Sequence, residues 1–328
     1  MKAAVYHAYG SPDMLSVQDV ETPTPKDNEV LVNIRAAVVE PTDIAMRLGK
    51  PFIARFFSGL TRPKNPILGF ELAGDIEAVG KDVTRFKPGD RVFGATCDTS
   101  GSHAQYMCLP EDGTLTTIPE GMEYEEAVSI VDGAMTALPF LKEKGHIQPG
   151  QQVLINGASG SVGGYGVQLA KHFGANVTGV CGPTNIELVK SLGADEVIDY
   201  SKEDFTANGE RWDIVFDAVG KSSFSRCRSV LKPGGYYLTT VPSVGIMFFM
   251  PWTAIVGNKK ALMAATGLRP TEVRQKDLAV IKELMELGNI RPVIDRRYSL
   301  EDIAEAHRYV EAGHKKGSVI ITMEHDEA

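Results

Sequence analysis

Three glycines, Gly157, Gly160 and Gly163, follow one another at intervals of three, between an apolar run and a helical pattern. The run 152–156 predicts a buried strand, and 161–173 predicts a helix. A turn without Cβ atoms lets a pyrophosphate approach the main chain, while the helix directs N–H groups and its positive dipole end at the phosphates. We therefore predict dinucleotide binding, the alternative being a tight turn that only packs a helix. The expected phosphate contacts are Ala158, Ser159, Gly160, Ser161, Val162 and Gly163.

The end of the next predicted strand, 176–181, indicates which dinucleotide binds. NAD sites usually carry an acid there, which binds the adenosine ribose hydroxyls. The segment 180–185 has no carboxylate, so nothing repels a 2′-phosphate and NADPH is favoured; an arginine for that phosphate is missing too. Lys190 is better interpreted as a solvated helix residue. The expected contacts are Cys181, Gly182, Thr184, Asn185 and Tyr200.

Two regions of different architecture must position these residues. The first 120 residues contain short alternating strands and turns, which predict an antiparallel β domain. From about Tyr124, strands alternate with helices, which predicts a doubly wound, mostly parallel sheet. Two amphipathic helices follow residue 260. The second of them, 301–312, begins near a capping-box pattern formed by Ser299 and Asp302, and a closing strand at 317–322 is expected to return to the N-terminal domain. The other predicted strands are 196–199, 213–217 and 236–241, and the other helices are 185–192 and 222–231.

Composition narrows the function classes. The chain has 328 residues, with 34 Lys and Arg against 42 Asp and Glu, a net charge of −8. This balance argues against a nucleic-acid partner or an anionic membrane surface. Four scattered cysteines without a CxxC pair, and an N-terminus without a signal-peptide pattern, predict reduced thiols in a cytoplasmic protein.

A segment without charged side chains, 233–258, contains a continuous apolar part at 244–256. This part is shorter than the ~20 residues of a membrane span and contains Gly245 and Pro251. We expect it to be buried or to lie at an interface.

The order of the motifs resembles the medium-chain dehydrogenase/reductase superfamily, and within it the zinc-independent quinone oxidoreductase branch. The resemblance runs essentially the whole length of the chain. It rests on segments 67–74, 79–80, 86–92, 157–163, 192–200, 216–220 and 231–235.

The resemblance implies an α/β fold in which a GroES-like antiparallel β catalytic domain surrounds a Rossmann domain, with the active site in the cleft between them. We expect the catalytic domain at 1–123, the Rossmann domain at 124–262 and a return to the catalytic domain at 263–328. A homodimer, formed by Rossmann sheets pairing edge to edge, is also implied.

Zinc is not expected. In zinc-dependent relatives a cysteine stands at the position of Glu40, and a histidine at that of Phe70, which has no ligand atom. The four closely spaced cysteines of a structural zinc site are absent, since Cys97 and Cys108 stand eleven residues apart.

The catalytic residues of this branch are harder to assign to positions in this sequence. The loop that faces the nicotinamide in this branch often begins Asn-Pro-x-Asp with a tyrosine shortly after, whereas Glu40 and Ala45 occupy the Asn and Tyr positions here. Glu40, Thr42 and Asp43 are the candidate catalytic groups. An ionised carboxylate cannot donate to an oxyanion, so Glu40 or Asp43 must be protonated by its surroundings or only hold the loop.

The resemblance assigns further cofactor contacts. Val219 and Gly220 are expected beneath the adenosine, Thr240 and Val241 near the nicotinamide ribose, and Thr136 at the nicotinamide. His103 is a weaker candidate for an acid.

The implied function is NADPH-dependent hydride transfer to a small-molecule quinone or α,β-unsaturated carbonyl, without zinc. One alternative is an enoyl-thioester or alkenal reductase. The other, from a different class, is a protein that binds NADPH as a structural or sensor component without turnover.

Overall fold

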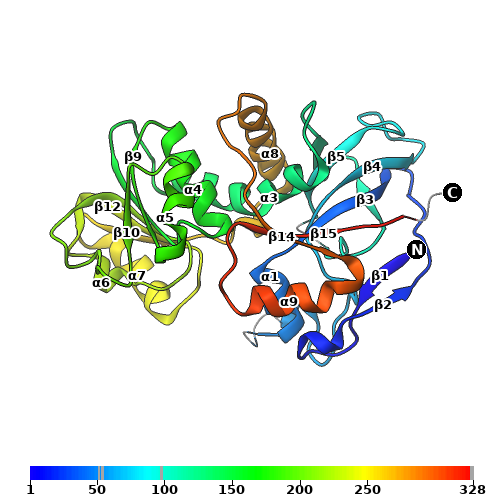
Figure 1. The fold of residues 1–328 in the computed structure, drawn as a ribbon, viewed down its shortest axis with the longest axis horizontal. Coiled ribbons are helices and arrows are strands. Elements are labelled where there is room, and N and C mark those ends of the chain that lie inside the picture. Colours follow the sequence, from blue (N-terminus) through cyan, green and yellow to red (C-terminus); the bar gives the residue numbers. More distant parts are fainter. Residues whose placement is uncertain (51, 53–54, 97–98, 326–328) are drawn as a thin grey trace. The chain divides into compact units, whose positions relative to one another are not determined.

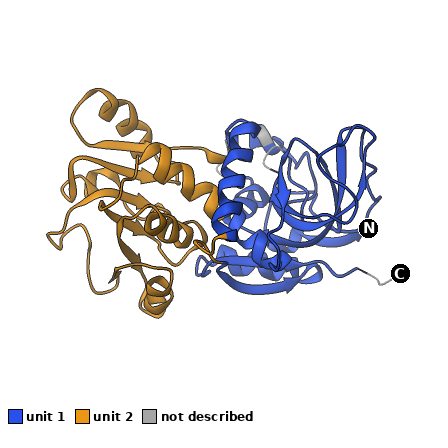
Figure 2. Ribbon diagram, turned by 90° about the horizontal axis from the view of Figure 1, so that it is seen from above, with its two compact units in different colours: residues 1–132, 268–286, 292–328 blue, residues 133–267, 287–291 orange. Residues whose placement is uncertain are grey.

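The computed structural model describes residues 1–50, 52, 55–96 and 99–325. The chain divides into two compact units (Figures 1 and 2). Unit 1 comprises residues 1–132, 268–286 and 292–328, and unit 2 comprises residues 133–267 and 287–291. The division between the first two segments thus falls after Asp132, where the sequence prediction placed it after residue 123. The second division falls after Gly267, where the prediction placed it after residue 262.

Unit 2 is built on one six-stranded parallel sheet, and its strand order is β10-β9-β8-β11-β12-β13. The chain begins in the middle at β8, runs outward through β9 and β10, and then returns to continue on the other side of β8. This is the doubly wound order that the alternating pattern predicted, and the reversal between β8 and β11 creates a switch point at the carboxyl ends of the strands. Its strands are β8 (Gln152–Asn156), β9 (Asn176–Cys181), β10 (Glu196–Asp199), β11 (Trp212–Asp217), β12 (Leu231–Thr239) and β13 (Lys260–Met263).

The central strands of this sheet are apolar because both faces are covered. Val153, Leu154 and Ile155 of β8 are completely buried, as expected for a parallel strand between two layers of helices. Gly179 lets a helix approach this sheet, since a Cβ there would lie 2.4 Å from the side chain of Val189. The helices are α4 (Ser161–His172), α5 (Ile186–Ser191), α6 (Phe224–Cys227) and α7 (Val244–Ile255).

Unit 1 contains a seven-stranded, largely antiparallel sheet. Its order is β14-β15-β3-β4-β5-β7, with β6 pairing with β3. The long strand β3 (Glu29–Val39) organises this sheet, because β4, β6 and β15 all pair with it. The other strands are β4 (Glu71–Val79), β5 (Arg91–Ala95), β6 (Tyr106–Pro110), β7 (Thr114–Thr117), β14 (Ile294–Ser299) and β15 (Ser318–Thr322), and a two-stranded sheet is formed by β1 (Lys2–Val5) and β2 (Ser16–Asp19).

The closing strand β15 joins the N-terminal sheet. Residues Val319 to Thr322 pair antiparallel with Val39 to Ala36 of β3. Buried side chains from both ends of the sequence share one core, in which Val32, Ile34, Val319 and Ile321 are fully buried. The helices of this part of the chain are α1 (Pro41–Leu48), α2 (Arg55–Ser58), α3 (Tyr124–Pro139), which crosses into unit 2, α8 (Thr271–Glu286) and α9 (Ile303–Glu311).

Two local predictions are wrong. The helix expected at 222–231 is only α6, because Leu231 already pairs with Trp212 as the first residue of β12. Ser299 does not cap a helix through its side chain; its hydroxyl donates to the Asp302 carboxylate at 2.8 Å instead.

The charge-free segment was expected to be buried or at an interface. It forms α7 in spite of Gly245 and Pro251, and in the single chain it leaves large apolar side chains exposed. Val244 and Ile255 are 88% and 87% exposed. No helix in the described residues is both long enough and apolar enough to span a membrane.

Candidate active site

The glycine turn follows β8 at the switch point of the unit 2 sheet. Gly157 has a positive φ of 82°, and a Cβ there would lie 2.4 Å from Val219. A Cβ on Gly163 would lie 2.1 Å from the carbonyl oxygen of Gly157. Both positions therefore require glycine for the packing of the protein itself.

Gly160 differs from these two glycines. It is the N-cap residue of α4 with an ordinary φ of −80°, and a Cβ there would contact only the Gly157 oxygen, at 3.5 Å, among the described residues. The space in front of the helix is thus open, and the first-turn N–H groups of a helix have no intrahelical acceptor. An open glycine before a helix N-terminus suits the close approach of a dinucleotide phosphate.

The predicted adenosine contacts come together at the carboxyl ends of β9 and β10. Asn185 donates its amide to the Ser159 hydroxyl at 3.1 Å, which ties this edge to the glycine turn. Thr184 donates to the Asn185 side-chain oxygen at 3.4 Å. Tyr200 is 67% exposed, and its hydroxyl lies 3.1 Å from where a Cβ on Gly182 would be. The four side chains other than Gly182 present hydroxyl and amide groups, with no carboxylate among them.

Cys181 is buried at the end of β9, and burial raises the pKa of its thiol to about 11. It is therefore a neutral packing residue at this edge. Asp199, at the end of β10 opposite Cys181, is a carboxylate that the sequence reasoning missed because it searched only the end of β9. Its Oδ1 accepts from the hydroxyl and N–H of Ser201, and these bonds lower its pKa. Asp199 thus stabilises the turn that follows β10.

A second group of predicted residues lies at the ends of β11 and β12. Gly220 has a positive φ of 63°, and a Cβ there would lie 2.6 Å from that of Val241. Thr240 donates its hydroxyl to the Ala218 carbonyl at 3.2 Å. Val219 and Val241 are 40% and 41% exposed, so both apolar side chains are partly available to a ligand.

Asp217 organises this edge, and the sequence reasoning did not identify it. It is fully buried at the end of β11, where its Oδ1 accepts from the Asn156 amide at 2.9 Å. Its Oδ2 accepts from the Tyr237 hydroxyl at 3.0 Å and from the Ser222 N–H at 2.8 Å. An aspartate directly after a buried strand was the available sign, since a buried carboxylate must be satisfied by donors. The loop 218–222, including Val219 and Gly220, is therefore held by one side chain.

Thr136 lies on the part of α3 that belongs to unit 2. Its hydroxyl is 3.5 Å from that of Thr266.

The candidate catalytic residues belong to unit 1, where α1 begins. Glu40 is 2% exposed, and its Oε2 forms an ion pair with Lys315. Asp43 is fully buried and accepts the N–H of Glu40 at 2.9 Å and that of Gly69 at 3.0 Å. Both carboxylate oxygens of Asp43 thus accept hydrogen bonds from backbone N–H groups. Thr42, in contrast, is exposed.

Burial dominates the electrostatics of these carboxyl groups. It raises the pKa of Glu40 to about 8, although the ammonium of Lys315 acts in the opposite direction. Burial also raises the pKa of Asp43. Burial therefore favours the protonated form of Glu40, the form that a hydrogen-bond donor requires, whereas the pairing with Lys315 favours the ionised form. His103 is fully buried and its Nε2 lies 2.8 Å from the Val38 carbonyl oxygen, so it belongs to the core.

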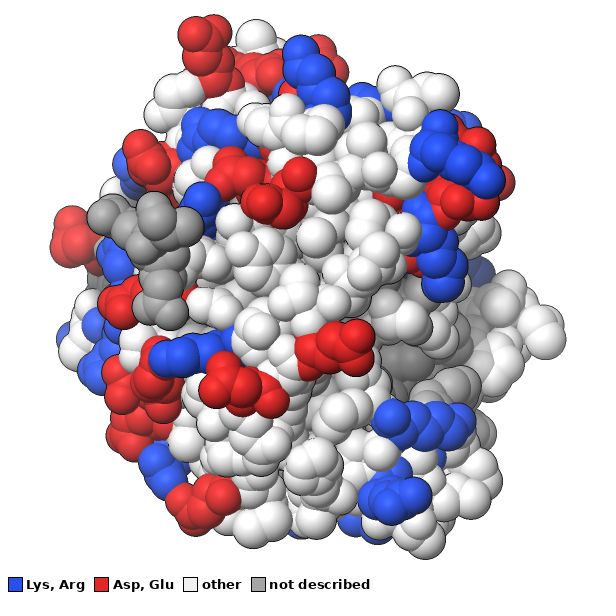
Figure 3. Space-filling view, turned by 90° about the vertical axis from the view of Figure 1, so that its right-hand side faces the viewer, with Lys and Arg blue, Asp and Glu red and all other residues white. Residues whose placement is uncertain are grey.

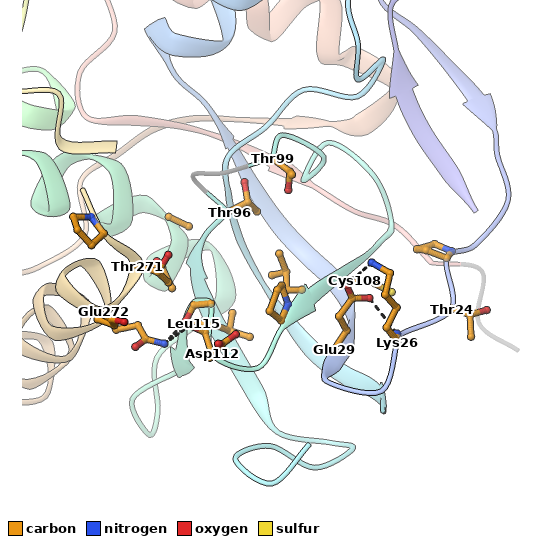
Figure 4. Close-up of a pocket in the computed structure, with 18 residues that line it drawn as sticks. Thr24, Lys26, Glu29, Thr96, Thr99, Cys108, Asp112, Leu115, Thr271 and Glu272 are labelled. Atoms are coloured by element: carbon orange, nitrogen blue, oxygen red, sulfur yellow. Dashed lines mark hydrogen bonds and ion pairs between the residues drawn. The ribbon is translucent and has the colours of Figure 1, made fainter. Parts of the chain in front are cut away.

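A cavity of about 830 Å³ lies in unit 1 (Figure 4). Its wall includes the ion pair of Lys26 with Glu29, and Thr96, which is 7% exposed and whose hydroxyl has no partner among the described residues. None of the predicted catalytic or cofactor residues lines it. We therefore assign it no part in the chemistry below.

No group of three or more His, Cys, Asp or Glu side chains that could hold a metal ion occurs in residues 1–50, 52, 55–96 and 99–325. Cys97 lies outside the described residues, and Cys108, Cys181 and Cys227 are free thiols.

Comparison with known proteins agrees with this geometry. Residues 26–139 match the family described as alcohol dehydrogenase GroES-like domain, and residues 192–321 match the family described as zinc-binding dehydrogenase. The chain is 32% identical to a 2-methylene-furan-3-one reductase of Solanum lycopersicum, over 98% of this chain and 79% of that protein.

Two further relatives are similar over almost their full length. A quinone oxidoreductase of Pseudomonas aeruginosa is 31% identical, over 98% of this chain and 99% of that protein. The solved structure of the quinone oxidoreductase from Coxiella burnetii superposes with a TM-score of 0.87 at 27% identity, covering 99% of both chains. Together with the doubly wound sheet and the glycine turn, these similarities show that the chain is an oxidoreductase that belongs to the quinone oxidoreductase branch of the medium-chain dehydrogenase/reductase superfamily.

Proposed function

We propose that this protein uses NADPH to reduce a small-molecule quinone or α,β-unsaturated carbonyl compound, without zinc. The observation that carries the proposal is the open glycine at the N-terminus of α4, where the protein itself leaves room that a phosphate can fill. The names of the relatives, quinone oxidoreductases and an enone reductase, support the choice of acceptor.

Different residues would contact different parts of the cofactor. The turn 157–163 and the N–H groups of α4 would hold the pyrophosphate. Ser159, Thr184, Asn185 and Tyr200 would surround the adenosine ribose, with hydroxyl and amide groups that accommodate a 2′-phosphate. Val219 and Val241 would pack against the cofactor, and Thr136 would contact the nicotinamide. The bound nicotinamide supplies a hydride to an electron-poor carbon.

Zinc independence is part of the proposal because of the donor set. Phe70 offers no ligand atom, and the Oε2 of Glu40 is engaged by Lys315. Metal analysis of the purified protein tests this point, and stoichiometric zinc would contradict it.

A steady-state assay tests the activity. We expect NADPH oxidation with at least one member of a panel of 1,4-quinones, alkenals and enoyl thioesters. The second candidate function, an enoyl-thioester reductase, predicts that the thioesters are preferred. Two solved structures of similar fold carry the name enoyl reductase, with TM-scores of 0.87 and 0.85 at 24% and 23% identity. Tight NADPH binding without consumption on any acceptor would leave a structural or sensor role.

Fluorescence titration tests the cofactor preference. We expect NADPH to bind more tightly than NADH, and Tyr200→Phe to weaken the binding of NADPH more than that of NADH. Equal affinity for the two cofactors would contradict the assignment of the edge formed by β9 and β10.

We further propose that the protein is a cytoplasmic homodimer that binds neither nucleic acid nor membranes. The free thiols of Cys108, Cys181 and Cys227 support a reducing compartment. On the face in Figure 3, cationic and anionic side chains are interspersed and form no continuous basic patch. The exposed apolar side chains of α7 precede β13, an edge strand of the unit 2 sheet, and a second copy pairing at this edge would cover them.

A further inference from the structure

Two fully buried histidines of unit 1 lie next to each other with perpendicular rings. His103 precedes β6 and His307 lies on α9, and their ring centroids are 5.8 Å apart. Both side chains are 0% exposed. Each ring has one nitrogen that forms a hydrogen bond and one buried nitrogen without a partner among the described residues.

The partners of the two bonded nitrogens determine where the protons lie. Nε2 of His103 is 2.8 Å from the Val38 carbonyl oxygen, which can only accept, so this nitrogen carries a proton. Nδ1 of His307 is 3.3 Å from Nε of Arg47, which can only donate, so this nitrogen carries none. A neutral His307 with its proton on Nε2 is therefore the form that fits the contact.

Arg47 joins α1 to α9, two helices that lie side by side in Figure 1. Its guanidinium is fully buried in the last turn of α1. Nη1 donates to the Gly10 carbonyl, Nη2 forms an ion pair with Glu311, and Nε donates to His307. His307 and Glu311 stand one turn apart on α9, so a single arginine contacts this helix at two successive turns.

The other charged groups around the two histidines are engaged elsewhere. Burial raises the pKa of Asp43 on α1, and the charge of His103 acts in the opposite direction. The charged groups on α9 and on the segments packed against it form the pairs Arg308 with Asp13, Arg308 with Glu305, Tyr309 with Asp295, and Lys315 with Glu40. Arg47 is thus the cation that contacts His307.

Protonation of His307 would break its contact with Arg47. The added proton would occupy Nδ1, which faces the Nε–H of Arg47, so two donors on two cations would lie against each other in a buried place. The hydrogen bond would be lost and two buried charges would repel each other. Burial, His103 and Arg47 all lower the pKa of His307, which agrees with the neutral form.

We propose that the contact between Arg47 and His307 is a pH-sensitive switch that joins α1 to α9 while the imidazole is neutral and releases them when Nδ1 takes a proton. The switch lies entirely within unit 1. It goes beyond the proposed function and does not depend on it. Since α1 carries the candidate catalytic residues Thr42 and Asp43, the switch makes the order of their helix depend on the pH of the solution.

The direction of the pH dependence follows from proton binding. The pKa of His307 is well below its ordinary value of 6.5 in the folded protein, so the released state binds the extra proton. The contribution of the contact is complete above this value and is lost as the pH falls below it. The equilibrium constant for local opening should therefore rise by up to about tenfold for each pH unit below 6.5.

Hydrogen–deuterium exchange of the full-length protein tests this dependence, with mass spectrometry of the peptides that contain α1, α9 and α4. The exchange is followed from about pH 7.5 to about pH 5 and corrected for the intrinsic exchange rate at each pH. We expect the protection of α1 and α9 to fall in the acid range, while that of α4 in unit 2 stays constant. Constant protection of α1 and α9 across this range would overturn the proposal.

His307→Gln isolates the titrating group, because a glutamine oxygen can accept from Arg47 but takes no proton in this range. We expect this variant to keep the protection of α1 and α9 and to lose its pH dependence. His314→Gln is the matched control, since it removes an exposed histidine seven residues further along the chain and should behave as wild type. The same acid-dependent loss of protection in His307→Gln as in wild type would rule out His307 as the switch.

Nitrogen-15 NMR of histidine-labelled wild-type protein gives a test that needs no variant. Among the seven histidines, we expect at least one ring that stays neutral below pH 6.5 with its proton on Nε2. If His307→Gln does not fold, this spectrum decides. A spectrum in which every ring is charged just below pH 6.5, or in which the neutral ring carries its proton on Nδ1, would contradict the proposal.

Discussion

The three glycines of the turn 157–163 occupy positions with different steric requirements. A side chain on Gly163 would collide with backbone, and one on Gly157 would collide with Val219. A side chain on Gly160 would collide with nothing closer than 3.5 Å among the described residues. Packing among the described residues therefore does not require glycine at position 160, and the proposed phosphate contact supplies a reason for it.

We expect Gly160→Ala to fold normally and to bind NADPH at least tenfold more weakly. The loss of an N-cap glycine costs about 1 kcal/mol or less of stability, whereas a tenfold loss of affinity corresponds to about 1.4 kcal/mol of binding free energy. Thermal unfolding and fluorescence titration measure the two effects separately. Gly163→Ala is the comparison, because it should lose stability first. Unchanged NADPH affinity in Gly160→Ala would show that the phosphate does not lie against residue 160.

Glu40 should make stability fall as the pH rises. Its pKa is about 8 in the folded protein against an ordinary value of 4.5, so between these values the folded state binds the extra proton. The contribution of Glu40 is therefore complete below the lower value and is lost as the pH rises through the higher one. Gln imitates the protonated acid, so Glu40→Gln should gain stability relative to wild type over this window.

Urea unfolding at a series of pH values measures this difference, whose slope cannot exceed about 1.4 kcal/mol per pH unit for one proton. Glu301→Gln, at a half-exposed glutamate, serves as the control. A difference between Glu40→Gln and wild type that does not vary with pH would show that Glu40 is ionised throughout.

At the scale of elements, one carboxylate joins three strands of the unit 2 sheet. Asp217 ends β11, accepts from Asn156 at the end of β8 and from Tyr237 of β12, and also holds the following loop through Ser222. Asp217→Asn replaces an acceptor oxygen by a donor group, so at least one of these donors is left unsatisfied. Each unsatisfied buried group costs about 1–3 kcal/mol.

We therefore expect Asp217→Asn to lower both the melting temperature and the affinity for NADPH. Tyr237→Phe removes a single hydrogen bond to Asp217 and leaves the bond from the Ser222 N–H in place, so it should lower the melting temperature with little effect on affinity. If both variants lose affinity equally, the loop is not what Asp217 positions.

The unit 2 elements that carry the site were predictable because local pattern and tertiary environment agree there. The apolar run of β8 and the glycine spacing before α4 specify a strand, a turn and a helix without distant information. The segment 222–231 was not predictable in the same way, because the pairing of Leu231 with Trp212 ends α6 early. The ion pair of Glu40 with Lys315 was even less predictable, because its partners are 275 residues apart in the sequence and Lys315 lies in the last connection before β15.

At the scale of the whole molecule, the exposed face of α7 should decide the oligomeric state. Met247 and Phe248 are 62% and 64% exposed on a helix without any charge. We expect Phe248→Asp to convert a dimer into monomers, because a charge would be buried without a partner in the contact. Sedimentation velocity measures this change. Leu287→Asp, at a residue 65% exposed elsewhere in unit 2, should leave the dimer intact; a monomeric wild-type protein would contradict the proposal.

The pairing of β15 with β3 also determines the order in which the chain can fold during synthesis. Unit 2 is almost one continuous segment, so its parallel sheet can form once residue 267 or so has left the ribosome. The sheet of unit 1 cannot be completed until residues 318–322 emerge, although most of its strands are made first. Until then residues 36–39 of β3 lack a partner on this edge, since β6 pairs only with residues 29–33 there. This short unpaired stretch is where premature association with other chains would begin.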